Sequence, residues 1–266
     1  MKPFLKWAGN KYQIIDRIKT ILPTGQRLIE PFAGSCAVFL NTEFPSYLLN
    51  DSNADLINLF EFLKKDGHFF IKYTQCYFQP KYNTEQAFYE LRDQFNQTSD
   101  LQLKAALFVY LNKHAYNGLC RYNSRGGFNV PYGRYKKPYF PEKEMLFFCE
   151  KASQAEFCNK DFADIMLSAK QGDVVYCDPP YVPLTNTANF TSFTSSGFNL
   201  DQQKQLASLA SELAAKGIPV IISNHATEFT DEHYCSAKMI TFDVQRFISC
   251  DGKNRGKAKE VLAIFD

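Results

Sequence analysis

The sequence predicts an α/β protein in which an open sheet is interrupted by a helical insertion. Apolar runs with the length of strands alternate with helix-like runs at both ends of the chain, whereas the middle of the chain breaks this alternation. A chain of 266 residues with 45% hydrophobic residues is also long enough to bury a large core. We therefore expect a sheet domain built from residues 1–55 and 145–266, and a second domain inserted at residues 56–144.

The N-terminal part of the sheet domain supplies two predicted strands. Residues 27–34, RLIEPFAG, form a short apolar run that ends in a glycine turn, and residues 35–41, SCAVFLN, are expected to begin a helix. Residues 46–53, SYLLNDSN, predict a second strand that ends at Asp51. Each strand is thus followed by small or polar residues.

The C-terminal part supplies three more predicted strands. They lie at residues 172–181, GDVVYCDPPY, at residues 218–225, IPVIISNH, and at residues 259–266, KEVLAIFD. An amphipathic helix at residues 200–217 joins the first two and closes on Gly217. Because an open α/β sheet binds its ligands at the carboxyl ends of the strands, we expect the functional residues just after these runs.

The insertion is predicted to be helical at first and then rich in loops. Residues 85–95, EQAFYELRDQF, and residues 101–113, LQLKAALFVYLNK, have helical patterns. Residues 112–141 then contain Lys and Arg but no Asp or Glu, with many aromatic residues between them, although the whole chain has a net charge of only +2. Basic side chains interleaved with aromatic rings are typical of DNA-binding surfaces, so we favour that interpretation over a solvated loop.

Several classes of protein are not indicated by the sequence. The first residues, MKPFLKWAGNKY, contain no apolar stretch of signal-peptide length, and no segment has the composition of a membrane span. The 8 cysteines form no C-x-x-C pair and have no histidine at metal spacing, so we expect them to be reduced and mostly buried. We expect a cytoplasmic protein with no membrane association, no metal and no obligatory protein partner.

Two features of the first strands predict a nucleoside pocket. The turn at residues 30–36, EPFAGSC, follows a strand, so its backbone N–H groups could hold a polar ligand. Asp51 follows the next strand, where an acid accepts hydrogen bonds from ribose hydroxyls in nucleoside-binding sheets. The turn is not the G-x-G-x-x-G dinucleotide motif, which favours an adenosine-containing ligand that need not have a diphosphate. Alternatively, Gly34 serves only a tight turn and Asp51 only caps a helix.

The segment DPPY at residues 178–181 has the chemistry of an amine-binding site. Asp178 follows a buried strand, and the two prolines after it hold the backbone carbonyls in an extended conformation. The Asp178 carboxylate and the Pro179 carbonyl could accept both N–H groups of an exocyclic amine on a base and direct its lone pair at an electrophilic methyl group. Tyr181 would stack on the base.

D-P-P-Y resembles the catalytic motif of S-adenosylmethionine-dependent amino methyltransferases. With FLKWAGNK, PFAGS, YNGLCRYN, FNVPYGRYKKPYFP and VVYCDPPY in this order, the chain resembles the Dam family of DNA adenine-N6 methyltransferases over essentially its whole length. The resemblance implies a Rossmann-like open-sheet methyltransferase domain with an inserted, mostly helical DNA-recognition domain. It also implies methyl transfer from S-adenosyl-L-methionine to N6 of adenine in double-stranded DNA, in GATC, with base flipping into the D-P-P-Y pocket.

The resemblance implies a role for each matching residue. The catalytic residues would be Asp178, Pro179, Pro180 and Tyr181. The cofactor-binding residues would be Trp7, Ala8, Gly9, Lys11, Phe32, Gly34, Ser35, Asp51, Asp161, Phe162 and Asp178. The DNA-binding residues would be Lys6, Tyr116, Asn117, Leu119, Arg121, Asn123, Pro131, Arg134, Tyr135, Lys136 and Lys137.

Within the DNA-binding set, the resemblance implies distinct contacts. Tyr116 would intercalate and Asn117 would face the orphaned thymine, while Arg121 would read a guanine. Leu119 and Pro131 would meet thymine methyl groups.

Two positions depart from the family pattern near the cofactor. Cys36 stands where the family usually has a second glycine, and Asn10 stands where it usually has glycine in W-A-G-G-K. Neither change removes a cofactor ligand named above, but both could alter cofactor affinity.

Other functions fit the sequence less well. An RNA or protein-glutamine methyltransferase would usually have Asn in place of Asp178, and a cytosine-C5 enzyme would need a cysteine after a proline, whereas Cys177 lies within a strand and fits the core. A DNA-binding repressor that had lost catalysis would have a damaged D-P-P-Y motif. His225, in SNHAT, is expected to cap or hydrogen-bond locally and not to act as a base, since the amine proton can leave to water.

Overall fold

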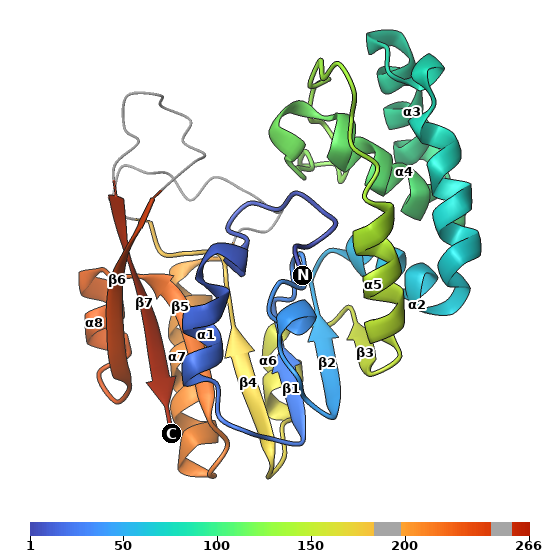
Figure 1. Ribbon diagram of the computed structural model, residues 1–266. Helices are drawn as coiled ribbons and strands as arrows, with labels where there is room; N and C mark the ends of the chain where they lie inside the picture. The colour runs from blue at the N-terminus through green and yellow to red at the C-terminus, as the bar shows by residue number, and fades with distance from the viewer. Residues whose placement is uncertain (184–197, 246–256) are drawn as a thin grey trace.

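The computed structural model describes residues 1–183, 198–245 and 257–266, and its central element is a seven-stranded sheet (Figure 1). The strand order is β3-β2-β1-β4-β5-β7-β6, and β1 to β5 are parallel, whereas β7 runs antiparallel to both β5 and β6. The strands are β1 (Arg27–Glu30), β2 (Ser46–Asn50), β3 (Ala155–Cys158), β4 (Asp173–Cys177), β5 (Val220–His225), β6 (Lys238–Gln245) and β7 (Lys257–Phe265). The predicted α/β class with an open sheet is confirmed.

Helices cover both faces of the sheet, which explains the continuous apolar strands. Leu28 and Tyr176 point into one core, whereas their neighbours Ile29 and Cys177 point into the other. The first core is covered by α1 (Ile15–Ile21), α2 (Ala54–Gln75) and α5 (Glu142–Ala152), and the second by α6 (Phe162–Leu167) and α7 (Leu200–Ala215). A strand that is buried on both faces needs apolar side chains at every position, not only at alternate ones.

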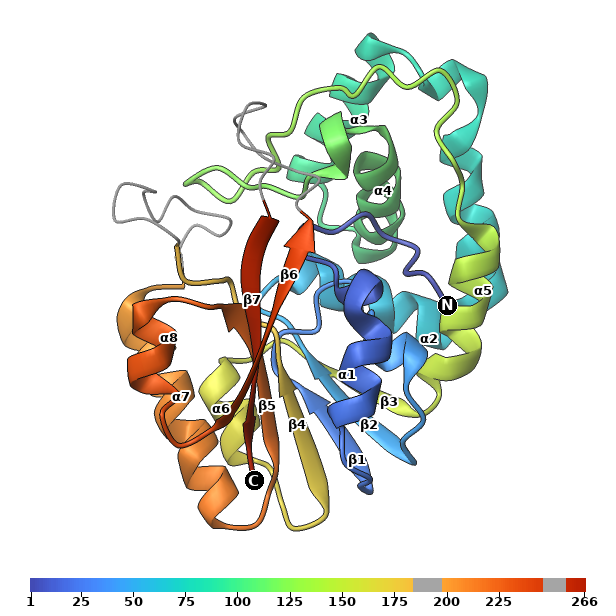
Figure 2. The same cartoon turned by 60° about the vertical axis from the view of Figure 1, so that its left-hand side comes forward.

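α2 of the insert packs along the sheet, whereas the rest of the insert stands beyond the carboxyl ends of β1, β2 and β4 (Figures 1 and 2). Its two predicted helices are α3 (Glu85–Gln97) and α4 (Leu101–His114), with short 3-10 turns η3 (Cys76–Phe78), η4 (Pro80–Tyr82) and η5 (Tyr116–Gly118) around them. Thr84 and Asp100 cap the N-termini of α3 and α4 with their side-chain oxygens. The first core continues without a break from the sheet into α4, and α5 includes residues on both sides of the predicted boundary at residues 144 and 145. The division into residues 1–55 and 145–266 and residues 56–144 therefore remains a prediction.

One predicted helix is wrong. Residues 35–41 form only a 3-10 turn, η2 (Phe39–Asn41), because the chain turns sharply just before it. Gly34 and Cys36 have φ angles of 47° and 59°, in the left-handed region that a right-handed helix cannot use. The expectation that the cysteines are mostly buried is also wrong, since only Cys36 and Cys177 are buried among those that the structure describes.

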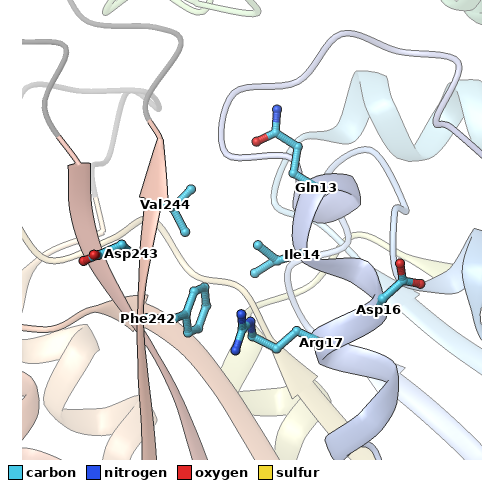
Figure 3. A pocket seen from close by; sticks show the side chains of 7 residues that line it. All are labelled: Gln13, Ile14, Asp16, Arg17, Phe242, Asp243 and Val244. Atoms are coloured by element: carbon cyan, nitrogen blue, oxygen red, sulfur yellow. The ribbon is translucent and has the colours of Figure 1, made fainter.

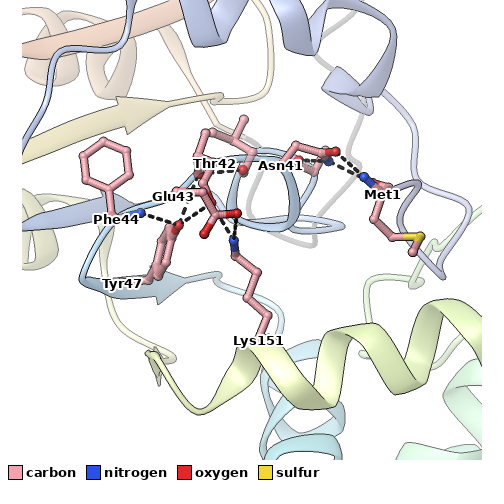
Figure 4. A network of polar contacts seen from close by, with 9 residues as sticks. Met1, Asn41, Thr42, Glu43, Phe44, Tyr47 and Lys151 are labelled. Atoms are coloured by element: carbon pink, nitrogen blue, oxygen red, sulfur yellow. Dashed lines mark hydrogen bonds and ion pairs between the residues drawn. The ribbon is translucent and has the colours of Figure 1, made fainter.

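A polar network holds the N-terminus and α5 against the loop before β2 (Figure 4). The Met1 ammonium group donates to Asn41, and the buried Lys151 ammonium group of α5 donates to the Thr42 carbonyl and pairs with Glu43 at 3.1 Å. The Tyr47 hydroxyl also donates to the Thr42 carbonyl at 2.6 Å. These bonds fix the start of the segment that leads to residues 6–11.

Candidate active site

Asp178 lies directly after β4, beside a buried cation. Lys11, the first residue of η1 (Lys11–Ile14), places its Nζ atom 2.8 Å from Oδ1 of Asp178 and donates to the Gly9 carbonyl at 2.6 Å. The Lys11 side chain is only 6% exposed, whereas that of Asp178 is 23% exposed. Burial raises the pKa of Asp178 to about 6, although Lys11 acts in the opposite direction. The Asp178 carboxylate is thus paired with Lys11 but remains partly exposed, so it can accept a further hydrogen bond.

Tyr181 is held next to Asp178 by contacts to its hydroxyl group and to its ring. Its hydroxyl lies 2.5 Å from the Ser223 hydroxyl and 3.3 Å from a carboxylate oxygen of Glu260. The Lys11 ammonium group lies 4.6 Å from the centre of its ring, and the His225 ring meets it edge-on at 4.7 Å. The ring of the D-P-P-Y motif is therefore fixed beside the carboxylate.

The glycine turn and Asp51 meet at the ends of β1 and β2. The Gly34 N–H donates to one oxygen of Asp51 at 3.0 Å, and the Asn53 N–H donates to the other at 2.9 Å. A Cβ atom on Gly34 would come within 2.8 Å of Nε1 of Trp7, so only glycine lets this ring approach. Burial raises the pKa of Asp51, although these N–H groups oppose the shift. Each oxygen keeps a lone pair for a further donor.

The two departures from the family pattern have clear structural consequences. Asn10 donates from its side chain to the Ser35 hydroxyl at 3.0 Å and accepts from the Tyr12 N–H at 2.7 Å, so it joins the N-terminal segment to the glycine turn. Cys36 is fully buried and has a φ angle of 59°, which is a conformation that favours glycine. The glycine that the family usually has at this position would therefore suit the backbone conformation that Cys36 adopts.

Two of the predicted cofactor-binding residues belong to an aromatic cluster. Phe32 stacks on Phe162 with ring centres 5.4 Å apart, and Phe198 meets both rings edge-on. Asp161 is exposed and caps α6 by accepting from the Ala163 N–H at 2.8 Å. Phe32 and Phe162 are therefore brought together, whereas Asp161 has a local capping role in this structure.

Two buried polar groups near Asp178 were missed by sequence reasoning. Glu30 ends β1 and is 2% exposed, and its Oε1 atom has no hydrogen-bond partner within the described part of the chain. The same holds for the hydroxyl of Tyr176 in β4. Burial raises the pKa of Glu30 to about 8, so it is largely uncharged at neutral pH. Nothing in a strand sequence of RLIE distinguishes such a carboxyl from one that points to solvent.

The predicted base-contacting residues lie in η5 and the loop after it. Tyr116 is 54% exposed, and Asn117 has a φ angle of 54°, so the turn presents both side chains at the surface. The Tyr116 N–H donates to the Pro131 carbonyl at 2.9 Å, which places these two predicted contacts side by side. Leu119 is half-buried against the core.

The N-terminal segment is joined to the same turn. Asn112 accepts from the Lys6 N–H at 2.9 Å and donates to the carbonyls of Lys6 and Gly118 at 2.7 and 3.2 Å. The Lys6 ammonium group lies 4.2 Å from the centre of the Tyr135 ring. Residues from three distant parts of the sequence thus share one surface.

The remaining basic residues of the insert differ in their surroundings. Arg121 is exposed and donates to the Asn129 side chain at 2.8 Å, and Arg134 is exposed and pairs with Glu85 at 3.6 Å. Asn123 accepts from the backbone of its own turn, at residues 125 and 127, while Lys136 and Lys137 are exposed. Lys113 is 7% exposed, and its burial lowers its pKa to about 8.

A family comparison decides what kind of enzyme this site belongs to. The model of D12 class N6 adenine-specific DNA methyltransferases matches residues 7–248. The chain belongs to this family. The match includes the glycine turn, the insert and the D-P-P-Y motif. The protein is therefore a DNA adenine methyltransferase, and its reaction requires DNA and a methyl donor.

Curated relatives support the same assignment for this methyltransferase. It is 49% identical to a DNA adenine methylase of Escherichia coli K12 over 99% of this chain and 95% of the relative. It is 47% identical to a DNA adenine methylase of Serratia marcescens, with 99% and 98% covered. The match to the solved structure of a precorrin 8W decarboxylase from Methanobacterium thermoautotrophicum covers 96% of this chain and 89% of the decarboxylase chain. Its TM-score is only 0.40 at 7% identity, which is too low a similarity to support a conclusion.

A surface hollow lies beside η1, the 3-10 turn that begins with Lys11 (Figure 3). It has a volume of about 360 Å³ between η1, α1 and β6, and the Arg17 guanidinium group lies 4.5 Å from the centre of the Phe242 ring across it. Its lining residues are Gln13, Ile14, Asp16, Arg17, Phe242, Asp243 and Val244. None of them belongs to the predicted catalytic, cofactor-binding or DNA-binding sets.

Residues 1–183, 198–245 and 257–266 of the methyltransferase hold neither a metal-binding cluster nor a membrane-spanning helix. They contain no group of three or more His, Cys, Asp or Glu side chains arranged to hold a metal ion. No helix in these ranges is long and apolar enough to cross a membrane. Cys177, which lies in β4 and is fully buried, has a raised pKa because of that burial, so it is not a nucleophile for cytosine chemistry.

Proposed function

We propose that this DNA adenine methyltransferase uses S-adenosyl-L-methionine and methylates adenine N6 within GATC sites of double-stranded DNA, after the base flips into the D-P-P-Y pocket. The observation that carries the proposal is the position of Asp178. It follows β4, and β4 pairs in parallel with β1, which ends in the glycine turn. An amine acceptor and a nucleoside-binding turn therefore share one edge of the sheet.

The residues around the glycine turn fit S-adenosyl-L-methionine. Asp51 keeps lone pairs for the two ribose hydroxyls, because within residues 1–183, 198–245 and 257–266 each of its oxygens accepts one backbone hydrogen bond. Phe32 and Phe162 provide an apolar wall suited to an adenine ring. Trp7 closes the turn at Gly34, where a side chain would not fit. When bound, the cofactor supplies an electrophilic methyl group.

The D-P-P-Y segment accounts for the choice of an exocyclic amine. Asp178 would accept one N–H group of adenine N6 and the Pro179 carbonyl the other, which makes the nitrogen lone pair available for attack. Tyr181 would stack on the base. The ring is already fixed by Ser223 and Glu260, so little reorganisation is needed when the base arrives.

The insert supplies the contacts that base flipping and sequence reading require. Tyr116 is an exposed ring on a tight turn, suited to fill the space that a flipped base leaves. Asn117 beside it would face the orphaned thymine, and Arg121 would make paired bonds to a guanine. Leu119 and Pro131 would contact thymine methyl groups. GATC contains the guanine and thymines that these contacts need.

The test is a methylation assay with labelled S-adenosyl-L-methionine and duplexes that differ only in GATC or a scrambled site, followed by digestion to nucleosides. We expect label in N6-methyl-2′-deoxyadenosine, and only from GATC. Label in scrambled DNA at the same rate would refute the sequence assignment.

The pocket is tested with Asp178→Ala. This variant should lose methyl transfer and keep DNA affinity, because the carboxylate acts on the extruded amine and not on the duplex. Near-normal turnover by the variant would refute the role of Asp178.

A further inference from the structure

We infer that two buried amides, Gln203 of α7 and Asn224 of β5, are positioning residues for methyl transfer because they clamp the backbone that follows Pro179. The inference rests on the proposed function, in which the Pro179 carbonyl and the Tyr181 ring hold the target base. Both amide side chains are fully buried, and neither has a part in the site described above.

The clamp contacts the D-P-P-Y loop at two points. Gln203 donates from Nε2 to the Pro180 carbonyl at 2.6 Å, and Asn224 accepts through Oδ1 from the Val182 N–H at 3.0 Å. The two amides are joined to each other, since Nδ2 of Asn224 donates to Oε1 of Gln203 at 3.1 Å. The hydroxyl of buried Tyr234 accepts a second bond from Asn224 Nδ2 at 3.0 Å.

The loop itself fixes which way each amide points. The Pro180 carbonyl can only accept, so Gln203 must turn its nitrogen toward it and its oxygen toward Asn224. The Val182 N–H can only donate, so Asn224 must turn its oxygen toward the loop and its nitrogen toward Gln203. Only one orientation of each amide therefore satisfies all three bonds. The bonds connect Pro180 to Val182, two residues later in the loop, through the two amide side chains.

The geometry limits the movement of the catalytic groups. β4 ends at Cys177, which is paired with Ile222 of β5, and the clamp begins at the Pro180 carbonyl. Only Asp178 and Pro179 lie between these two fixed points. The residues next to Asn224 add two contacts, because the Ser223 hydroxyl meets that of Tyr181 and Nδ1 of His225 lies 2.6 Å from the Val182 carbonyl.

Stability alone does not explain these residues. A pair of buried amides can be exchanged for apolar groups of the same shape with little or no loss of stability, because the net gain from a neutral hydrogen bond is small. An apolar pair would fill the space between α7 and β5 but would not bond to the Pro180 carbonyl or the Val182 N–H. What the amides add is a fixed orientation of the loop, and misplacement by about 1 Å can lower a rate roughly 100-fold.

The first test is Gln203→Met, which keeps the length of the side chain and removes the donor. We expect the single-turnover rate on GATC duplexes to fall roughly 10- to 100-fold, with KM for DNA and for S-adenosyl-L-methionine little changed. The matched control is Gln202→Met, one residue away on the same helix. Gln202 accepts from the Asn199 N–H in the capping box of α7 and makes no hydrogen bond to residues 178–183. It should lose some thermal stability and keep the wild-type rate.

The second test is Gln203→Glu, which separates the hydrogen bond from volume. A buried carboxyl group has a raised pKa, and its protonated form can donate to the Pro180 carbonyl while its other oxygen accepts from Asn224. Its rate relative to the wild type should therefore be higher at about pH 6 than at about pH 8.5, whereas the relative rate of Gln203→Met should not change in this way.

The outcomes distinguish this inference from the proposed function. If Gln203→Met loses thermal stability but keeps the wild-type single-turnover rate, or if Gln203→Glu shows no recovery at low pH, the clamp does not position the catalytic groups. A duplex with 2-aminopurine at the target adenine reports base flipping by its fluorescence. If the wild type gives no increase in fluorescence, base flipping fails, whatever the variants do.

Discussion

Replacing Lys11 with methionine tests whether this lysine keeps Asp178 ionised. The change keeps the side-chain length and removes the cation that lies 2.8 Å from the carboxylate. Removal of an opposite charge at this distance raises a carboxyl pKa by roughly 1–3 units. The pKa of Asp178 is about 6 with Lys11 in place, and the other groups that act on it are Glu260, which raises it, and the Tyr181 hydroxyl, which lowers it.

The size and sign of the effect follow from the ionised fraction. Ionised Asp178 is a stronger acceptor of an amine N–H than the protonated acid and stabilises the positive charge that develops on the nitrogen, so activity is present above its pKa and is lost as the pH falls through it. With a pKa of about 6, roughly nine-tenths of Asp178 is ionised at pH 7. After a rise of roughly two units, only about one-tenth is ionised, so the rate at pH 7 should fall roughly 9-fold and recover above about pH 9.

The measurement is kcat/KM for S-adenosyl-L-methionine from about pH 5.5 to about pH 9.5, because this ratio reports the pKa values of the enzyme before the cofactor binds. The control is Lys19→Met, which removes one charge from an exposed residue in the last turn of α1. Its acid limb should coincide with that of the wild type. If Lys11→Met lowers kcat/KM by the same factor at every pH, Lys11 does not act through the charge of Asp178.

Three further predictions concern the cofactor turn and the insert. Asp51→Ala should weaken S-adenosyl-L-methionine binding roughly 10-fold or more in calorimetry, because charged hydrogen bonds to ribose are worth about 1.5–3 kcal/mol; unchanged affinity would leave Asp51 only its structural bonds. Gly34→Ala should lower the free energy of unfolding, measured by urea denaturation, by about 1–2 kcal/mol because of its left-handed φ angle. The clash of the added methyl group with Trp7 should lower it further, and a wild-type denaturation midpoint would contradict this. Arg121→Ala should lose discrimination at one pair of GATC, worth ~1–3 kcal/mol, whereas Lys136→Ala should weaken binding to all sequences and flatten the salt dependence. Methylation rates on all single-pair variants of GATC at two salt concentrations compare the two, and an equal loss at every site would make Arg121 a backbone contact.

The strands that could be predicted are those with an unambiguous environment. β4 and β5 are covered by helices on both faces, so their sequences are almost continuously apolar. β3 was missed because it has only four residues and exposes Glu156. β6 was missed because it is the last strand of the sheet and carries polar side chains such as Lys238 and Asp243. An edge strand need not be apolar, so its sequence resembles that of a loop.

The site residues that could be predicted have chemistry that is visible in one short segment. Asp178 and Tyr181 belong to a four-residue motif, and Asp51 directly follows a strand. Lys11 was assigned to the cofactor site from the resemblance alone, and its ion pair with Asp178 had no signal in the sequence because the two residues are 167 positions apart. Glu30 was missed for a related reason, since burial of a carboxyl group depends on what packs over it.

Gln203 and Asn224 show why a clamp is harder to find than a motif. Gln203 is one of several glutamines in LDQQKQL, the first turns of α7. In the sequence it differs from the exposed Gln205 only in the side of the helix on which it lies. Its partner at Pro180 lies 23 residues earlier, and helical periodicity predicts burial but not pairing. A fully buried glutamine on an amphipathic helix is nevertheless a signal, because an amide is buried at a cost unless every polar atom is bonded. The two prolines that precede Val182 remove backbone donors from the loop, so it cannot build a regular hydrogen-bond ladder of its own. Side chains from α7 and β5 then supply these bonds, so the orientation of the D-P-P-Y loop depends on residues that no motif contains.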